Sequence, residues 1–345
     1  MTDPGQQLLE KVFKTLQIDD AWSERGDRCF SWIAYRLQQR VLVHRPVDDD
    51  GFTLYKMVAE TTVIENVQAT AGKVDEVLSD LNRFAFGSAY SYDPQKKSIS
   101  STTSTWIHDE TAGWRGRLFE MFCMGQLCFA ETEADFLAER CGGVVARRVH
   151  PVSGLRQYPD DMLNFIEDYF IPGNNAPNRF ENPFEFEAVA DMAKTNSFLA
   201  TQGADAHGIA LERCFDDWTA ISILTSSIKH RRVGVGVTSI IQLPNIITEV
   251  EGHLICASLN RNERDAGPLA SHFGAWCIDR APSGRPAVTY KGFYPSLAYQ
   301  DGLILDLALI CNRRMEWADQ QINARPTRGN AWERLAQRLG MGKRG

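Results

Sequence analysis

The chain has 345 residues, with 37 Lys and Arg against 44 Asp and Glu, so its formal net charge is −7. Hydrophobic residues make up 43% and charged residues 23%, which excludes a disordered or low-complexity chain. The mild acidity argues against a nucleic-acid-binding protein, because such proteins carry a basic surface that contacts phosphates. The length is typical of about two domains.

The start of the chain and its cysteines favour a cytoplasmic location. Residues 1–6 contain no cationic stretch followed by an apolar core, so we expect no signal peptide. No apolar run approaches the ~20 residues that a transmembrane helix needs, so we expect no membrane span. The 8 cysteines form no Cys-x-x-Cys pair, which indicates buried thiols in a reducing compartment.

Residues 1–141 predict one α+β unit. Apolar residues recur at helical spacing in three segments, and β-branched and aromatic residues are concentrated between them. Gly142-Gly143 is expected to stop the last helix. In chain order we expect a helix (6–16), three strands (28–67), a helix (73–82) and two strands (84–92 and 98–107). A helical segment (112–140) follows, either as one long helix or as two helices with a joint near Thr132.

Residues 142–183 are rich in Pro, Gly and Asn and are therefore predicted to be a connector, with one helix at 160–170. Residues 184–321 then repeat the order of the first unit, with one strand to spare. Here we expect a helix (183–194), strands (198–200, 209–211, 218–224 and 233–243), a helix (247–260), two strands (273–279 and 286–294) and a helix (299–320).

Short sequence pairs recur at matching places in the two halves. A Phe-Gly pair opens each hairpin, a Gly lies at the start of each long helix, and a Leu-Asn pair lies near the end of the preceding helix. These are Phe86-Gly87 and Phe273-Gly274, Gly113 and Gly302, and Leu81-Asn82 and Leu259-Asn260. We therefore predict an α+β fold of two tandem α-βββ-α-ββ-α units with antiparallel sheets.

This order of elements resembles the type III secretion chaperone-like fold, which the YbjN-like proteins share. Phe86-Gly87 and Phe273-Gly274 are the nearest to a signature. Such proteins are small chaperones or adaptors that commonly dimerise and bind a partner polypeptide without turning over a substrate. The resemblance implies an intramolecular pseudo-dimer, monomeric or homodimeric, that binds a polypeptide client and is not an enzyme. It transfers no individual binding residue.

No motif predicts catalysis, a metal or a cofactor. The run at 234–237 lacks the third Gly and the Lys of a phosphate-binding loop and is interpreted as a strand. Cys123 and Cys128 are interpreted as core residues, and the 7 histidines are scattered. The acidic residues in 108–110 are expected to favour a helix N-terminus, and 48–51 to form a hairpin tip. An enzyme with a site assembled from dispersed residues and a regulatory scaffold without a peptide groove are the alternatives.

The tail, residues 322–345, contains our only candidate site residues. Asn330 can cap a short helix over 331–339, on which Trp332, Leu335 and Leu339 form an apolar stripe. Arg and Lys residues make this end basic. The tail is interpreted either as a frayed terminus or as a docking helix that packs on the chain itself or on a partner.

Overall fold

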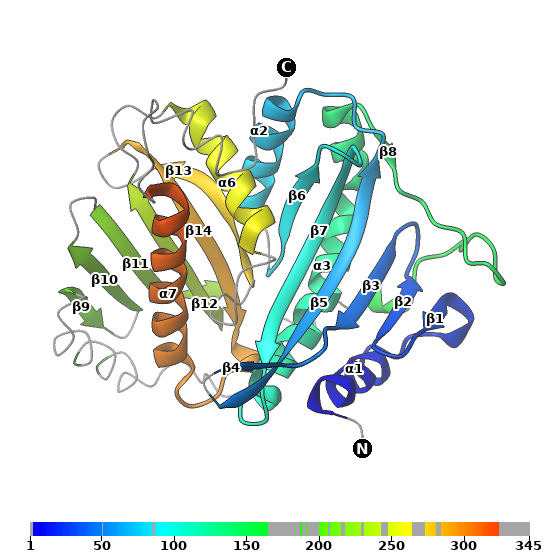
Figure 1. The fold of residues 1–345 in the computed structure, drawn as a ribbon, viewed down its shortest axis with the longest axis horizontal. Helices are drawn as coiled ribbons and strands as arrows, with labels where there is room; N and C mark the ends of the chain where they lie inside the picture. Colours follow the sequence, from blue (N-terminus) through cyan, green and yellow to red (C-terminus); the bar gives the residue numbers. More distant parts are fainter. Residues whose placement is uncertain are drawn as a thin grey trace.

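The computed structural model describes residues 3–49, 51–84, 87–164, 187, 191, 200–205, 208–214, 218–228, 231–242, 248–263, 273–280 and 284–323. The fold is α+β, with two antiparallel sheets side by side and helices α2 and α6 between them (Figure 1). Within these residues, no helix combines the length and the apolar character that crossing a membrane requires.

The first sheet has the strand order β1-β2-β3-β5-β7-β6, and β4 and β8 each pair with β5. Helix α3 packs against β5 and β7, and α1 packs against β3, β5 and α3. The elements of the first half, in chain order, are α1 (Pro4–Thr15), the 3₁₀ turn η1 (Asp20–Trp22), β1 (Ser23–Arg25), β2 (Cys29–Ile33), β3 (Gln38–Val43), β4 (Val47–Asp49), β5 (Phe52–Glu65), α2 (Ala71–Asn82), β6 (Ala89–Asp93), β7 (Ser98–Ile107), α3 (Ala112–Cys141), β8 (Val144–Val145) and the 3₁₀ turn η2 (Asp161–Leu163).

The second sheet has the order β9-β10-β11-β12-β14-β13. Helix α7 packs against β11 and β12, and α6 packs against β13 and β14. Its elements are β9 (Ala200–Asp205), β10 (Gly208–Cys214), β11 (Trp218–Ile228), β12 (Arg231–Gln242), α6 (Glu249–Glu263), β13 (Gly274–Arg280), β14 (Pro286–Pro295), the 3₁₀ turn η4 (Ser296–Ala298) and α7 (Leu303–Asn323).

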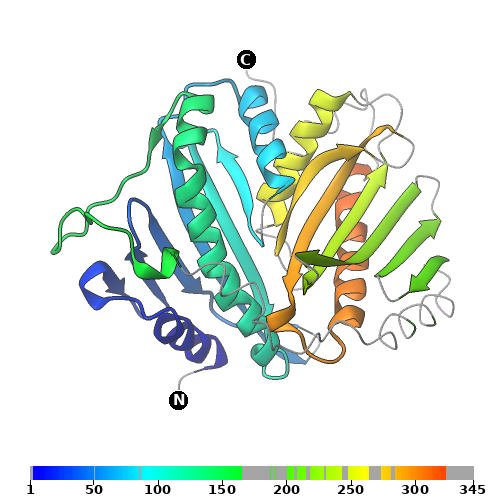
Figure 2. The same ribbon diagram turned by 180° about the vertical axis from the view of Figure 1, so that it is seen from behind.

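The two sheets have the same strand arrangement. In each sheet four neighbouring antiparallel strands follow one another along the chain, with only the short β4 intervening between β3 and β5, and a helix then leads to a hairpin. The second strand of that hairpin joins the sheet, and the first strand becomes its edge. The long helices α3 and α7 cover opposite faces, because α7 lies in front of its sheet in Figure 1 and α3 lies in front of its sheet in Figure 2.

Most expected elements are present, but the strands of the first half differ in number. The three strands expected over 28–67 are β2, β3 and β5, and the short strands β1 and β4 are additional. The hairpin strand expected over 84–92 begins only at Ala89, because Phe84 is 79% exposed and Gly87 has φ +67°. The helix expected over 160–170 starts as the 3₁₀ turn η2. Residues 165–170, and the helix expected over 183–194 apart from residues 187 and 191, fall outside the described residues.

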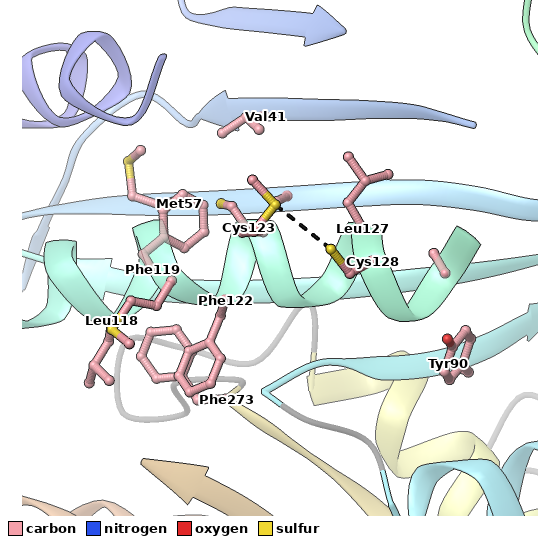
Figure 3. Close-up of a cluster of buried hydrophobic side chains, with 14 of the residues drawn as sticks. Val41, Met57, Tyr90, Leu118, Phe119, Phe122, Cys123, Leu127, Cys128 and Phe273 are labelled. Atoms are coloured by element: carbon pink, nitrogen blue, oxygen red, sulfur yellow. Dashed lines mark hydrogen bonds between the residues drawn. The ribbon is translucent and has the colours of Figure 1, made fainter. Parts of the chain in front are cut away.

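The buried apolar side chains of both halves form one contiguous core. The inner faces of the long helices α3 and α7 belong to this core. Phe122 of α3 contacts Phe273 of the second half with ring centroids 4.9 Å apart, as Figure 3 shows. The core therefore continues between the two sheets. The buried residues of these two helices include Trp114, Leu118, Phe122, Leu303, Leu307 and Ile310.

The first part of the connector packs on the first sheet. Strand β8 pairs with the end of β5, at Ile64 and Glu65. Further on, Arg156 donates a hydrogen bond of 2.8 Å to the Ile33 carbonyl and one of 3.0 Å to Asp160. These contacts hold residues 144–164 against the first sheet, from the end of β5 to the end of β2.

Candidate functional site: the groove between α2 and α6

Helices α2 and α6 form a large part of the contact between the halves. The apolar stripe of α2 is buried at Val74, Val77 and Leu78. Helix α6 begins with a capping box, in which the Thr248 amide donates 2.7 Å to Glu251 Oε2 and the Glu251 amide donates 3.3 Å to Thr248 Oγ1. The two helices pack against each other, and each also packs on β13.

Each helix has an Asn that pairs with the edge strand of its own half. The Asn82 amide donates 3.0 Å to the Tyr90 carbonyl and accepts 2.8 Å from the Tyr90 N–H. In the second half, Asn260 donates 2.8 Å to the Trp276 carbonyl and accepts 2.8 Å from the Trp276 N–H. All of these groups are buried, where an unpaired polar group costs about 1–3 kcal/mol. Each Asn therefore fixes its helix against β6 or β13.

The Arg that follows each Asn reaches the edge strand of the other half. Arg83 Nη2 donates 2.9 Å to the Ile278 carbonyl of β13, and Arg261 Nη1 donates 3.1 Å to the Tyr92 carbonyl of β6. Ser79 Oγ also accepts 3.0 Å from the Ile278 N–H. These bonds satisfy outward-facing backbone groups that an exposed edge strand would offer to other chains.

The hydrogen bonds of Asn82 and Asn260 show that the expected match between the two Phe-Gly pairs is wrong by one residue. Gly87 precedes Tyr90 by three residues, and the residue three before Trp276 is Phe273 rather than Gly274. Gly87 has φ +67°, whereas Gly274 is the first residue of β13. Phe86 lies outside the described residues.

A groove of about 510 Å³ opens between α2 and the N-terminal part of α6. Three carboxylates and one ammonium give its lining a net negative charge. Lys73 lies 3.1 Å from Glu76, and this ion pair is exposed, so it is worth at most about 1 kcal/mol. The lining residues are Gly72, Lys73, Glu76, Asp80, Glu249, Val250 and His253.

His253 is the buried polar group of this groove. Its side chain is 8% exposed, and Nδ1 has no hydrogen-bond partner among the described residues. Burial lowers the pKa of His253, although the nearby carboxylates of Glu249, Asp80 and Glu76 oppose the shift. The imidazole is therefore neutral at pH 7, and its Nδ1 can donate or accept one hydrogen bond.

Asp75 occupies the matching position on α2, because Asp75 and His253 both lie seven residues before the Asn of their helix. Asp75 is 3% exposed, and its Oδ1 has no hydrogen-bond partner among the described residues. Burial raises its pKa to about 6, and the positive charge of Arg261 only partly offsets the shift. The contact between the halves thus contains two perturbed titratable groups.

Three buried cysteines, Cys123, Cys256 and Cys277, do not supply a reactive thiolate. Burial raises the pKa of Cys123 and Cys256, and the pKa of Cys277 to about 12, so these thiols stay protonated and unreactive. In the described part of the chain, no three His, Cys, Asp or Glu side chains are arranged to hold a metal ion. The groove offers negative charge and an imidazole, which suit a cationic, hydrogen-bonding group.

The candidates from the sequence have different outcomes. Trp332, Leu335 and Leu339 lie outside the described residues. The run at 234–237 lies within β12, and Cys123 and Cys128 are buried, as predicted.

The expectation for the acidic residues of 108–110 needs correction. Helix α3 begins at Ala112, so Asp109 and Glu110 precede its first turn. The His108 carbonyl instead accepts the N–H groups of Thr111 and Ala112, at 3.0 and 2.8 Å.

Sequence reasoning missed Asp75 and His253. In the sequence, each of these residues is a titratable side chain among apolar neighbours on a helix. That pattern indicates a buried titratable group only when a second helix is known to cover it. Among known proteins, no family model, curated protein or solved structure matches this chain. The assignment of the site therefore rests on its geometry and charges.

Proposed function

We propose that the chain is a non-enzymatic, polypeptide-binding chaperone or adaptor of the secretion chaperone-like type, built as an intramolecular pseudo-dimer. Residues 1–141 would be the first copy, 142–183 a connector, 184–321 the second copy and 322–345 a tail. The shared strand order of the two sheets supports this division.

One observation carries the proposal: the reciprocal hydrogen bonds of Arg83 and Arg261 across the contact between the halves. In a two-fold symmetric dimer, residue i of one subunit contacts residue j of the other, and j contacts i. Each Arg directly follows the Asn that pairs with an edge strand. The carbonyl that each Arg reaches lies two residues after the residue paired with the other Asn: Ile278 follows Trp276, and Tyr92 follows Tyr90. Two unrelated domains that met by chance would not be expected to repeat this pattern.

The polypeptide-binding role follows from the resemblance of the element order, and an affinity capture tests it. The tagged full-length chain is expressed in its native cell, and captured polypeptides are identified by mass spectrometry. One captured polypeptide is then purified and titrated against the chain by calorimetry. We expect saturable binding at a defined stoichiometry, with no chemical change in the bound polypeptide.

A matched pair of variants controls this experiment. Arg83→Gln with Arg261→Gln removes both crossing bonds, whereas Arg280→Gln removes an exposed Arg that bonds within its own hairpin, to the Gly284 carbonyl. We expect the double variant to weaken client binding and Arg280→Gln to leave it unchanged. Equal binding by both variants would contradict a role for the pseudo-dimer. Chemical conversion of a small molecule by the purified chain would favour the enzyme alternative.

A further inference from the structure

We propose that the groove between α2 and α6 is the docking site of the chain's own basic segment, residues 324–345. This inference goes beyond the proposed function, because it concerns an interaction within one chain and requires no client. The charge of the groove, the place where α7 ends and the composition of the segment point to this occupant.

The groove and the segment have complementary charges. The carboxylates of Glu76, Asp80 and Glu249 face one ammonium, that of Lys73. Lys73 pairs with Glu76 and Arg83 pairs with Asp80, so Glu249 is the groove carboxylate that has no ion pair among the described residues. The segment contains six Lys and Arg residues and a single Glu: Arg325, Arg328, Arg334, Arg338, Lys343, Arg344 and Glu333.

The end of α7 lies within reach of the groove. Helix α6 packs against both α2 and α7, and α7 ends at the same end of the molecule at which α2 and α6 begin (Figures 1 and 2). Packed helices lie about 8–10 Å apart, so two such steps span about 20 Å. The nine residues from Asn323 to Trp332 span about 30 Å when extended, which is more than this separation.

Two further features of the groove fit the apolar and hydrogen-bonding side chains of the segment. Val250 is 64% exposed and gives an apolar contact for the stripe of Trp332, Leu335 and Leu339. His253 offers a buried ring nitrogen that lacks a partner among the described residues, and a donor such as an indole or guanidinium N–H can satisfy it. A helix as short as 331–339 is marginal alone, so it requires a surface of this kind.

Amide hydrogen exchange on the purified full-length chain tests the docking. We expect slow exchange over residues 331–339 and over the first turns of α2 and α6. Glu76→Gln with Glu249→Gln in the groove, or Arg334→Gln with Arg338→Gln in the segment, should reduce both protections by about fivefold. Raising the salt concentration should also reduce both protections, because screening weakens exposed ion pairs.

The control variant is Asp48→Asn with Asp49→Asn, which removes two exposed carboxylates of β4 and changes the net charge equally. It should leave the exchange of residues 331–339 unchanged. Rapid exchange of these residues in the wild-type chain would overturn the proposal, and so would protection that survives the groove variant. Because no client is present, either result is distinguishable from a failure of the proposed chaperone function.

Discussion

Replacing Asp75 by Asn should stabilise the protein at neutral pH. The pKa of this carboxyl is raised from 3.8 to about 6 in the folded chain, chiefly by burial. A shift of about two pKa units corresponds to about 3 kcal/mol at ~1.36 kcal/mol per unit. Above pH 6 the Asp75 carboxyl is ionised in both the folded and the unfolded state. Only the folded state bears the free-energy cost of burying this charge. Asn has the same shape without the charge.

The dependence on pH follows from the direction of the shift. Below pH 3.8 both states are protonated, so Asp75 adds no penalty. Between pH 3.8 and about 6 the unfolded state ionises first, so stability falls as the pH rises through this window. The advantage of Asp75→Asn should therefore grow from about 1 kcal/mol near pH 4.5 to about 3 kcal/mol at pH 7.

Urea unfolding followed by tryptophan fluorescence measures this difference at the two pH values. The control is Asp80→Asn on the same helix, because the Asp80 side chain is 64% exposed and its removal should change stability by less than about 0.5 kcal/mol. If Asp75→Asn left the midpoint at pH 7 unchanged, or if its gain were equal at both pH values, the carboxyl would be solvated and this reasoning would be refuted.

Three further substitutions test the core by the same unfolding assay. Gly87→Ala should cost at least about 1–2 kcal/mol, because φ is +67° and the new Cβ would lie 1.9 Å from a ring carbon of Phe122. Leu118→Ala should cost about 2–5 kcal/mol, since Leu118 is fully buried, and a near-zero change would mean that the inner face of α3 is wrongly assigned. Glu263→Gln should cost about 3–5 kcal/mol, because it removes the carboxylate 2.6 Å from the buried Arg314 guanidinium, and a small effect would indicate that water solvates this pair.

The sequence by itself determined the elements whose residues carry a strong local signal. The helical segment of α3 follows from its apolar residues and from Gly142, which ends the helix in the left-handed region at φ +63°, whereas the structure shows that the segment is one helix with no joint near Thr132. The hairpin between β6 and β7 follows from the polar turn at 93–97 between two strand-forming runs. In both cases neighbouring residues supply most of the information, so no distant contact is needed to predict them.

Tertiary structure decided the short strands and the candidate site. Strand β1 is Ser23-Glu24-Arg25, which has no apolar pattern and is a strand only because it pairs with β2. The sequence repeats Leu-Asn in both halves, but the pairing of Asn82 and Asn260 with edge strands depends on which strand each helix packs against. The perturbed pKa values of Asp75 and His253 have the same origin, because burial at the contact between the halves removes water that isolated helices would keep.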